Sequence, residues 1–196
     1  MMVEDIFQII PSDWQRTNYY DKPFVLTPIN NPYSQEYIEL KARLQGNYFH
    51  VITGMYKIEN PMTYARYWNT KQRYEQKGNT RVLSLYHDTA LANCDSICHW
   101  NFDWRLGQRF KYGQGVYFSL YPDVAAKRSS PQNGIYRAMF VVDVLVQNVL
   151  RATRRDNIFL PTPEFDTVVA SDSMTYVKYF ESEFYPKYFA TYEVAL

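Results

Sequence analysis

The chain has 196 residues, of which 46% are hydrophobic and 21% are charged, a composition that excludes a mainly disordered protein. Its formal net charge of +1, from 21 basic and 20 acidic residues, excludes a chain-wide positive field that would attract nucleic acid or an anionic membrane. The length favours a single domain, and no stretch approaches the roughly 20 apolar residues of a membrane-spanning helix.

The first part of the chain is expected to hold an arm followed by strands and helices in alternation. We interpret residues 1–23 as an N-terminal arm, because they show little periodicity and contain a turn at Pro11–Asp13. We expect this arm to pack against the domain formed by residues 24–196. Hydrophobic periodicity and stop signals then predict a strand at 24–29, a helix at 33–46, a strand at 48–60 and a helix at 62–78.

From residue 80 onward, strand-forming sequence dominates. Aromatic and β-branched residues between turn signals predict strands at 80–87, 115–121, 136–150, 167–171, 175–180 and 185–194. A short helix is predicted at 90–100, and a short helix or turn at 122–130. Early helices followed by many strands are typical of the α+β class rather than of alternating βαβ units.

The two cysteines, Cys94 and Cys98, lie four residues apart in the predicted helix at 90–100 and therefore share one face. Cysteines in this arrangement more often serve as small core residues than as a disulfide. His99 lies beside them, but two thiols and one imidazole are one ligand short of a zinc site, so we expect no metal. Reduced cysteines, and an N-terminus without a basic segment before its apolar residues, predict an intracellular protein, cytoplasmic or nuclear.

A polar cluster stands at the end of the predicted strand 80–87, in the stretch LYHDTA at 85–90. Common catalytic motifs, namely a Gly-rich phosphate loop between strand and helix, HExxH and G-x-S-x-G, are absent from the sequence. A single histidine at a strand end is more often a hydrogen-bonded structural residue than a catalyst. The residue pattern alone therefore leaves the role of His87 open.

Three stretches resemble the catalytic core of the diphtheria-toxin-like ADP-ribosyltransferases, the poly(ADP-ribose) polymerase family. LYHDT, NFDWR and KYGQGVYFS follow one another in an order and spacing similar to those of the mono-ADP-ribosyltransferase subgroup that carries CCCH zinc fingers. Further similarity lies in PFVLTPI, YARYWNTKQRYEQK, MFVVDVLV, PEFDTVV and YPKYFATY, so the resemblance covers roughly residues 24–196. It implies an ADP-ribosyltransferase fold, with two packed antiparallel β-sheets and flanking helices.

The resemblance implies catalytic roles for three residues. The family's histidine binds a ribose hydroxyl of NAD, a role that falls on His87, and the tyrosine that stacks against the nicotinamide ring corresponds to Tyr117. A third position is glutamate in the chain-forming polymerases, and matching YPKYFATY to the subgroup's YPEYxIxY puts Phe189 there. Because a phenyl ring accepts neither a proton nor a hydrogen bond, this implies mono-ADP-ribosylation or no transfer at all.

Other positions depart from the family pattern. The glycine that follows the family's histidine offers its backbone N–H and C=O to the nicotinamide amide, and here it is Asp88. Eight residues after Tyr117, where the family has a serine for the nicotinamide carbonyl, stands Ala125, although Ser129 and Ser130 lie nearby and would serve after a shift of the loop. Three residues further, Arg128 replaces an aromatic ring. The candidate NAD-binding residues beside His87 and Tyr117 are therefore Asp88, Thr89, Tyr121, Ala125 and Arg128.

Two functions stay open on this basis. The retained histidine and tyrosine favour a mono-ADP-ribosyltransferase that takes NAD as substrate, modifies a protein acceptor and needs no metal. The three departures favour a catalytically inactive relative that keeps the fold as a protein-interaction module. Arg151, Arg154 and Arg155 form a basic cluster, but the near-neutral net charge favours a solvated loop between strands, and we expect neither nucleic acid nor a membrane as a partner of this chain.

Overall fold

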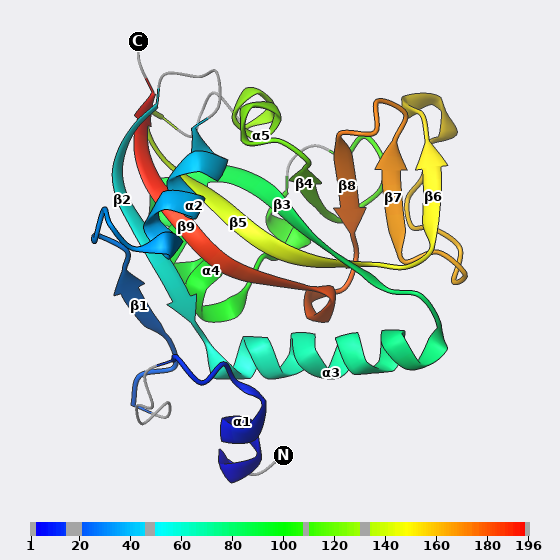
Figure 1. Ribbon diagram of the computed structural model, residues 1–196. Helices are drawn as coiled ribbons and strands as arrows, with labels where there is room; N and C mark the ends of the chain where they lie inside the picture. The colour runs from blue at the N-terminus through cyan, green and yellow to red at the C-terminus, as the bar shows by residue number, and fades with distance from the viewer. Residues whose placement is uncertain (1–2, 15–20, 46–49, 108–109, 130–133, 195–196) are drawn as a thin grey trace.

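A computed structural model shows a long, curved sheet flanked by helices (Figure 1). The structure describes residues 3–14, 21–45, 50–107, 110–129 and 134–194. The α-helices are α1 (Val3–Ile9), α2 (Gln35–Leu44), α3 (Pro61–Lys77), α4 (Cys94–Trp100) and α5 (Pro122–Arg128). The strands are β1 (Val25–Pro28), β2 (His50–Glu59), β3 (Arg81–Ala90), β4 (Val116–Ser119), β5 (Tyr136–Val146), β6 (Val149–Ala152), β7 (Thr167–Ala170), β8 (Thr175–Lys178) and β9 (Phe184–Val194). Short 3₁₀ helices are η1 (Leu91–Asn93), η2 (Trp104–Leu106), η4 (Arg154–Asp156) and η5 (Glu181–Glu183).

The predicted α+β class is confirmed, with one refinement of the sheet. The strands follow the order β1-β2-β9-β5-β3-β4-β8-β7-β6, and the register between β3 and β4 consists of the single pair Tyr86 and Ser119. Two groups of strands, five on one side and four on the other, thus meet at one residue pair and form one sheet rather than two separate ones (Figure 1). The described strand pairs are antiparallel except at one edge, where β6 runs parallel to β7.

Helix α3 begins where the sequence supplies a cap and a rigid first residue. The Asn60 side chain accepts a hydrogen bond from the Thr63 N–H at 3.0 Å, and Pro61 occupies the first helical position. The same side chain donates to the carbonyl oxygens of Cys98 at 2.8 Å and His99 at 2.9 Å. One buried amide therefore fastens the start of α3 to the end of α4.

Both faces of the sheet are covered by buried apolar side chains. The core on one face includes Phe118, Phe140 and Phe102, together with the free cysteines Cys94 and Cys98 of α4. The prediction that these cysteines are core residues is confirmed, and burial raises the pKa of Cys94 to about 12. The core on the opposite face includes Leu40, Leu44, Tyr86, Ala125, Met139, Val141 and Tyr192.

The N-terminal arm contains a helix that the sequence analysis did not predict. Helix α1 contacts α3, and Ile6, Ile10 and Trp14 are buried against Tyr185 of β9. The Trp14 ring also meets Tyr64 edge to face, with centroids 5.2 Å apart. Packing of the arm against the rest of the chain is thus observed, whereas its boundary at residue 24 stays a prediction.

The predicted strand 136–150 is divided into β5 and β6 by a turn at Gln147 and Asn148. The carboxylate of Asp166 accepts hydrogen bonds from the backbone N–H groups of both residues, at 3.2 and 2.5 Å for the closer oxygen in each case. In an uninterrupted strand these two N–H groups would bond a neighbouring strand, whereas here the Asp166 carboxylate accepts their hydrogen bonds. A side chain from 18 residues further along thus ends β5.

A buried cation ties the smaller group of strands to α3. Lys178 is fully buried, and its Nζ lies 2.8 Å from Asp166, 3.0 Å from the Thr167 hydroxyl and 3.3 Å from Glu183. Tyr74 of α3 donates to the other oxygen of Glu183. Burial raises the pKa of Glu183, and the nearby Lys178 ammonium opposes that rise.

In the part of the chain that the structure describes, no helix has the length and apolar character needed to cross a membrane.

We expect Lys178→Met to lower the free energy of unfolding by about 3 to 5 kcal/mol, because it leaves Glu183 buried without its cation. Denaturant unfolding followed by circular dichroism measures this loss. Lys187→Met, on the exposed side of β9, is the control and should stay within about 0.5 kcal/mol of the unchanged protein. A Lys178→Met variant as stable as that control would contradict the role given to this ion network.

Candidate active site

The candidate site is centred on His87, which lies inside β3 rather than at its end. Its register partner on β5 is Phe140. The imidazole contacts the Phe102 ring, with centroids 4.7 Å apart, and lies edge-on to Phe118 at 6.0 Å. Phe102 belongs to the NFDWR stretch, so the structure brings this motif against the histidine. The preceding Asn101 adopts a positive φ of 76° and donates to the carbonyl oxygens of Glu181 and Phe184.

One nitrogen of the His87 ring is already engaged. Nδ1 lies 2.8 Å from the Tyr117 carbonyl oxygen, and because a carbonyl only accepts, Nδ1 must carry the proton. Burial lowers the pKa of His87, while the Tyr117 carbonyl and the Asp88 carboxylate oppose that effect. In the neutral ring, Nε2 therefore carries a lone pair and is free to accept a hydrogen bond from a hydroxyl group.

Tyr117 and His87 are brought together where β4 separates from β3. The Tyr117 hydroxyl donates to the Gly113 carbonyl at 2.9 Å and accepts from the Tyr112 N–H at 2.8 Å. Its phenol thus holds the loop that precedes β4. Glycines shape this loop, since Gly113 has a φ of 109° and a Cβ at Gly115 would collide with the Lys178 carbonyl oxygen.

Phe189 lies in a row of aromatic side chains that crosses the sheet. Register pairs connect Tyr56 on β2, Phe189 on β9, Phe140 on β5 and His87 on β3. The Phe189 ring stacks on Tyr56 at 5.0 Å and on Phe140 at 5.3 Å, and only 4% of the residue is exposed. Phe189 therefore shares a face of the sheet with His87 but is separated from it by one strand.

Asp88 points away from His87. Successive side chains of a strand alternate between faces, and the Asp88 carboxylate lies on the side of Tyr192, a member of the opposite core. It accepts a hydrogen bond from the Tyr192 hydroxyl and forms an ion pair with Arg137 at 3.3 Å. The charge that replaces the family's glycine is thus paired and buried on the far side of the sheet. Burial and the Asp88 carboxylate raise the pKa of Tyr192.

Two hydroxyl groups lie next to this part of β3. Thr89 is buried, and its Oγ1 accepts a hydrogen bond from the Asn93 side chain at 2.8 Å. Ser129, directly after α5, donates from Oγ to the Asp88 carbonyl oxygen at 3.4 Å. The structure therefore brings the Ser129 hydroxyl to the backbone of residue 88.

The other candidate residues on α5 have different surroundings. Ala125 is 5% exposed and packs in the core that holds Tyr86 and Met139, so its side chain does not face His87. Arg128 forms an ion pair with Asp172 at 2.5 Å. Tyr121, at the start of α5, is exposed. Counting eight residues from Tyr117 therefore locates a core residue, because α5 turns that position toward the opposite face.

The comparisons with known proteins identify the family of the chain. Residues 34–195 match the family model described as the poly(ADP-ribose) polymerase catalytic domain. The chain belongs to this family. The curated mouse protein named protein mono-ADP-ribosyltransferase PARP12 is 27% identical over 161 residues, which cover 75% of this chain and 22% of that protein. Its human counterpart is 26% identical over 198 residues, covering 93% of this chain and 28% of that protein. The chain thus spans about a quarter of the length of these relatives.

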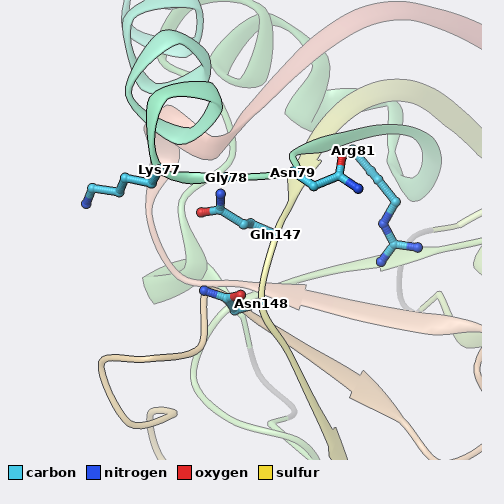
Figure 2. A pocket seen from close by; sticks show the side chains of 6 residues that line it. All are labelled: Lys77, Gly78, Asn79, Arg81, Gln147 and Asn148. Carbon is cyan, nitrogen blue, oxygen red and sulfur yellow. The ribbon is translucent and has the colours of Figure 1, made fainter.

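Within this poly(ADP-ribose) polymerase catalytic domain, a separate hollow of about 590 Å³ lies between the end of α3 and the β5–β6 turn (Figure 2). Gln147 points toward Gly78 and donates to the Tyr74 carbonyl at 3.0 Å. Arg81 precedes His87 by six residues of extended strand, roughly 20 Å, so this hollow is not part of the candidate site. Its lining residues are Lys77, Gly78, Asn79, Arg81, Gln147 and Asn148.

Sequence reasoning missed Arg137 and Tyr192. Of the two serines that it named as alternatives to Ala125, Ser129 lies at the Asp88 carbonyl, whereas Ser130 lies outside the described residues. Arg137 carried a signal, because a charged residue inside a long apolar strand is usually paired. Tyr192 is 104 residues from Asp88 along the chain, and no local pattern marks that contact. No cluster of three or more histidine, cysteine or acidic side chains suited to a metal ion occurs among the described residues.

The tautomer and pKa of His87 are testable by NMR. We expect its Nδ1 to be protonated and its titration midpoint to lie below 6.5, because burial disfavours the imidazolium. Between its folded pKa and 6.5 the unfolded chain binds more protons, so His87 should destabilise the fold as pH falls through this window. Two-dimensional ¹H–¹⁵N spectra, assigned by loss of the signal in His87→Gln, measure both properties. A midpoint at or above 6.5, or an Nε2 proton, would contradict the geometry described.

Proposed function

We propose that the chain is an NAD-dependent protein mono-ADP-ribosyltransferase. The observation that carries this proposal is the pairing of His87 Nδ1 with the Tyr117 carbonyl, which leaves Nε2 of the neutral ring as a hydrogen-bond acceptor. In the reaction, the bond between the ribose C1′ of NAD and the nicotinamide nitrogen breaks, and C1′ bonds to a nucleophilic oxygen or nitrogen of a protein side chain. Nicotinamide leaves with the bonding electrons and becomes neutral, and any proton on the acceptor passes to solvent.

His87 is proposed to hold the nicotinamide ribose. A ribose hydroxyl would donate to Nε2, and Tyr117 would supply an aromatic face for the nicotinamide ring. Positive charge develops at C1′ as the glycosidic bond lengthens, so a fixed orientation of the sugar lowers the barrier. The low pKa of His87 suits this task, because a neutral ring adds no positive charge beside the reacting carbon.

The edge of β3 that lacks a strand partner after Tyr86 is proposed to bind the nicotinamide amide. Residues 87–90 pair with β5 on one edge. On the other edge the pairing of β3 with β4 ends at Tyr86, and no other strand within the described residues pairs with 87–90. The Asp88 side chain leaves on the other face, so it does not cover this edge, and the Asp88 carbonyl, which accepts from Ser129 Oγ at 3.4 Å, keeps a second lone pair. By turning its O–H from that carbonyl to the nicotinamide amide, Ser129 would take the role that a residue count gave to Ala125.

Phe189 is proposed to limit the reaction to single transfers. Chain growth needs a group that activates a hydroxyl of the bound ADP-ribose, and an aromatic ring offers no acceptor for its proton. Stacking between Tyr56 and Phe140 keeps this position apolar. An acidic side chain of the protein acceptor would then supply the negative charge near C1′ and become the modified group.

An inactive interaction module is the second candidate, and the observation that favours it is Arg128. On the motif count Arg128 stands where the family has an aromatic ring over the nicotinamide, and its side chain forms an ion pair with Asp172. The buried carboxylate of Asp88 does not favour this candidate, because it lies on the opposite face.

For either function we propose a protein partner, neither nucleic acid nor a membrane, and a cytoplasmic or nuclear location where NAD is present. The division into an arm at 1–23 and a catalytic domain at 24–196 belongs to the same proposal.

Calorimetric titration with a non-hydrolysable NAD analogue tests the proposal. We expect saturable binding at micromolar affinity, and a loss of at least tenfold in His87→Ala, because the ribose loses its acceptor. His99→Ala, on α4, is the matched control and should bind normally. Labelled NAD should then transfer one ADP-ribose per modified side chain, as measured by mass spectrometry. Absent binding from folded protein would overturn the enzyme, and binding without transfer to any protein acceptor would favour the interaction module.

Ser129 provides a more specific prediction. Ser129→Ala should weaken binding of the NAD analogue about threefold to tenfold, because one hydroxyl donor to the nicotinamide amide is lost. Ala125→Gly, which removes only a methyl group that packs in the opposite core, should leave the affinity nearly unaltered. Equal affinity of the Ser129→Ala variant and the unchanged protein would show that the hydroxyl does not contact the ligand.

A further inference from the structure

Asp88 places a carboxylate in the interior of the protein, directly after His87. Its side chain is 0% exposed, and that of Arg137 is 12% exposed, at a separation of 3.3 Å between Nη1 and the nearer carboxylate oxygen. The Tyr192 hydroxyl donates to the second oxygen. A buried charge is tolerated only where such partners satisfy it, so the three side chains depend on one another. We call them the Asp88 triad.

The Asp88 triad connects three neighbouring strands. Asp88 lies on β3, Arg137 on β5 and Tyr192 on β9. Arg137 is the register partner of Tyr192, whereas Asp88 is opposite Met139, so the Arg137 side chain reaches diagonally across the β3–β5 pair. Arg137 also donates from Nε to the Gly134 carbonyl at 2.9 Å, which restrains its guanidinium. The contacts fix the lateral position of β3 relative to both strands.

The triad acts where backbone pairing is weakest. After Tyr86, the segment 87–90 keeps a strand partner on only one edge within the described part of the chain. Where β4 separates from β3, the Tyr117 carbonyl accepts its hydrogen bond from the His87 side chain instead of from a backbone N–H of β3. A strand held along one edge needs another restraint if its free edge is to keep a fixed position.

We propose that the Asp88 triad is a positioning device that holds segment 87–90 from the face opposite His87, so that the ligand-facing edge is preorganised. This inference rests on the proposed function. It adds residues that do not contact the ligand through their side chains but determine where His87 and the Asp88 backbone stand. Preorganisation of this kind raises affinity because less order must be created on binding.

The experiment compares two buried ion networks of the same protein. Arg137→Met removes the cation of the triad, and Lys178→Met removes the cation of the network around Glu183. Both should lower the melting temperature, by roughly 5 to 10 °C each, because each leaves a buried carboxylate without its cation. Only Arg137→Met should weaken binding of the NAD analogue, by at least tenfold, whereas Lys178→Met should change it less than twofold.

Two further variants separate positioning from general stability. Asp88→Ala combined with Arg137→Met removes the uncompensated charge and should recover melting temperature, but it restores no link to β3, so the affinity should stay low. Arg137→Lys keeps the charge and should retain part of the affinity. If Arg137→Met does not fold, Tyr192→Phe, which removes one hydroxyl, gives the same comparison with a smaller effect.

Amide hydrogen exchange distinguishes failure of this inference from failure of the proposed function. Residues 87–90 should exchange faster in Arg137→Met than in Lys178→Met, whether or not NAD binds. Unaltered protection of 87–90, or unaltered affinity in folded Arg137→Met, would overturn the positioning role. An unchanged protein that binds no analogue would overturn the proposed function alone, while faster exchange at 87–90 would still support the triad.

Discussion

The contact between β3 and β4 at the single pair Tyr86 and Ser119 is the constraint on which the candidate site depends. Up to this pair the two groups of strands form one sheet, and beyond it they separate. Separation leaves a carbonyl on β4 and an edge of β3 without their usual ladder partners. In this protein His87 takes the Tyr117 carbonyl, and the edge at Asp88 is approached by the Ser129 hydroxyl. The site is thus a consequence of where pairing stops.

Alternation along β3 explains how an acidic residue can follow the histidine without disturbing it. In a pleated strand, residues 87 and 88 must face opposite sides, so the imidazole meets Phe102 while the carboxylate meets Arg137 and Tyr192. The glycine of the family can be replaced here because Asp88 has an ordinary negative φ, unlike Asn101. The aspartate that replaces the family's glycine thus adds side-chain contacts from β3 to β5 and β9.

Much of the fold was predictable because its signals are local. Asn60 and Pro61 begin α3 and Gly78 follows its end, and the long strands carry the expected apolar residues. The pairing of His87 with Tyr117 was predictable only through the resemblance to the family. The turn at Gln147 was not, because it is produced by Asp166 from another segment. Helix α1 is short, and the arm is held by packing of Ile6, Ile10 and Trp14 against Tyr185, a residue far along the chain, which local periodicity does not reveal.

The location of Ala125 shows where counting along a motif fails. Counting a fixed number of residues from Tyr117 assumes that the helix turns the same face to the site as in the family. In this chain, α5 directs Ala125 into the core beside Met139. Ser129 follows the last turn of α5. What its side chain contacts is decided by the direction in which the backbone leaves the helix, and not by its distance from Tyr117 in the sequence. Contacts over 41 residues, such as that between Ser129 and Asp88, follow from the folded chain and not from its local pattern.

The aromatic row through Phe189 also constrains how this chain can change during evolution. A glutamate at position 189 would lie between the rings of Tyr56 and Phe140, in a place that is 4% exposed and lacks a cation among its ring neighbours. Burying a carboxylate there costs several kcal/mol or forces it to remain protonated. Phe189→Glu alone is therefore costly, because its stacking partners Tyr56 and Phe140 offer the carboxylate no compensating charge. An acidic residue at this position would need a simultaneous change of the aromatic rings around it.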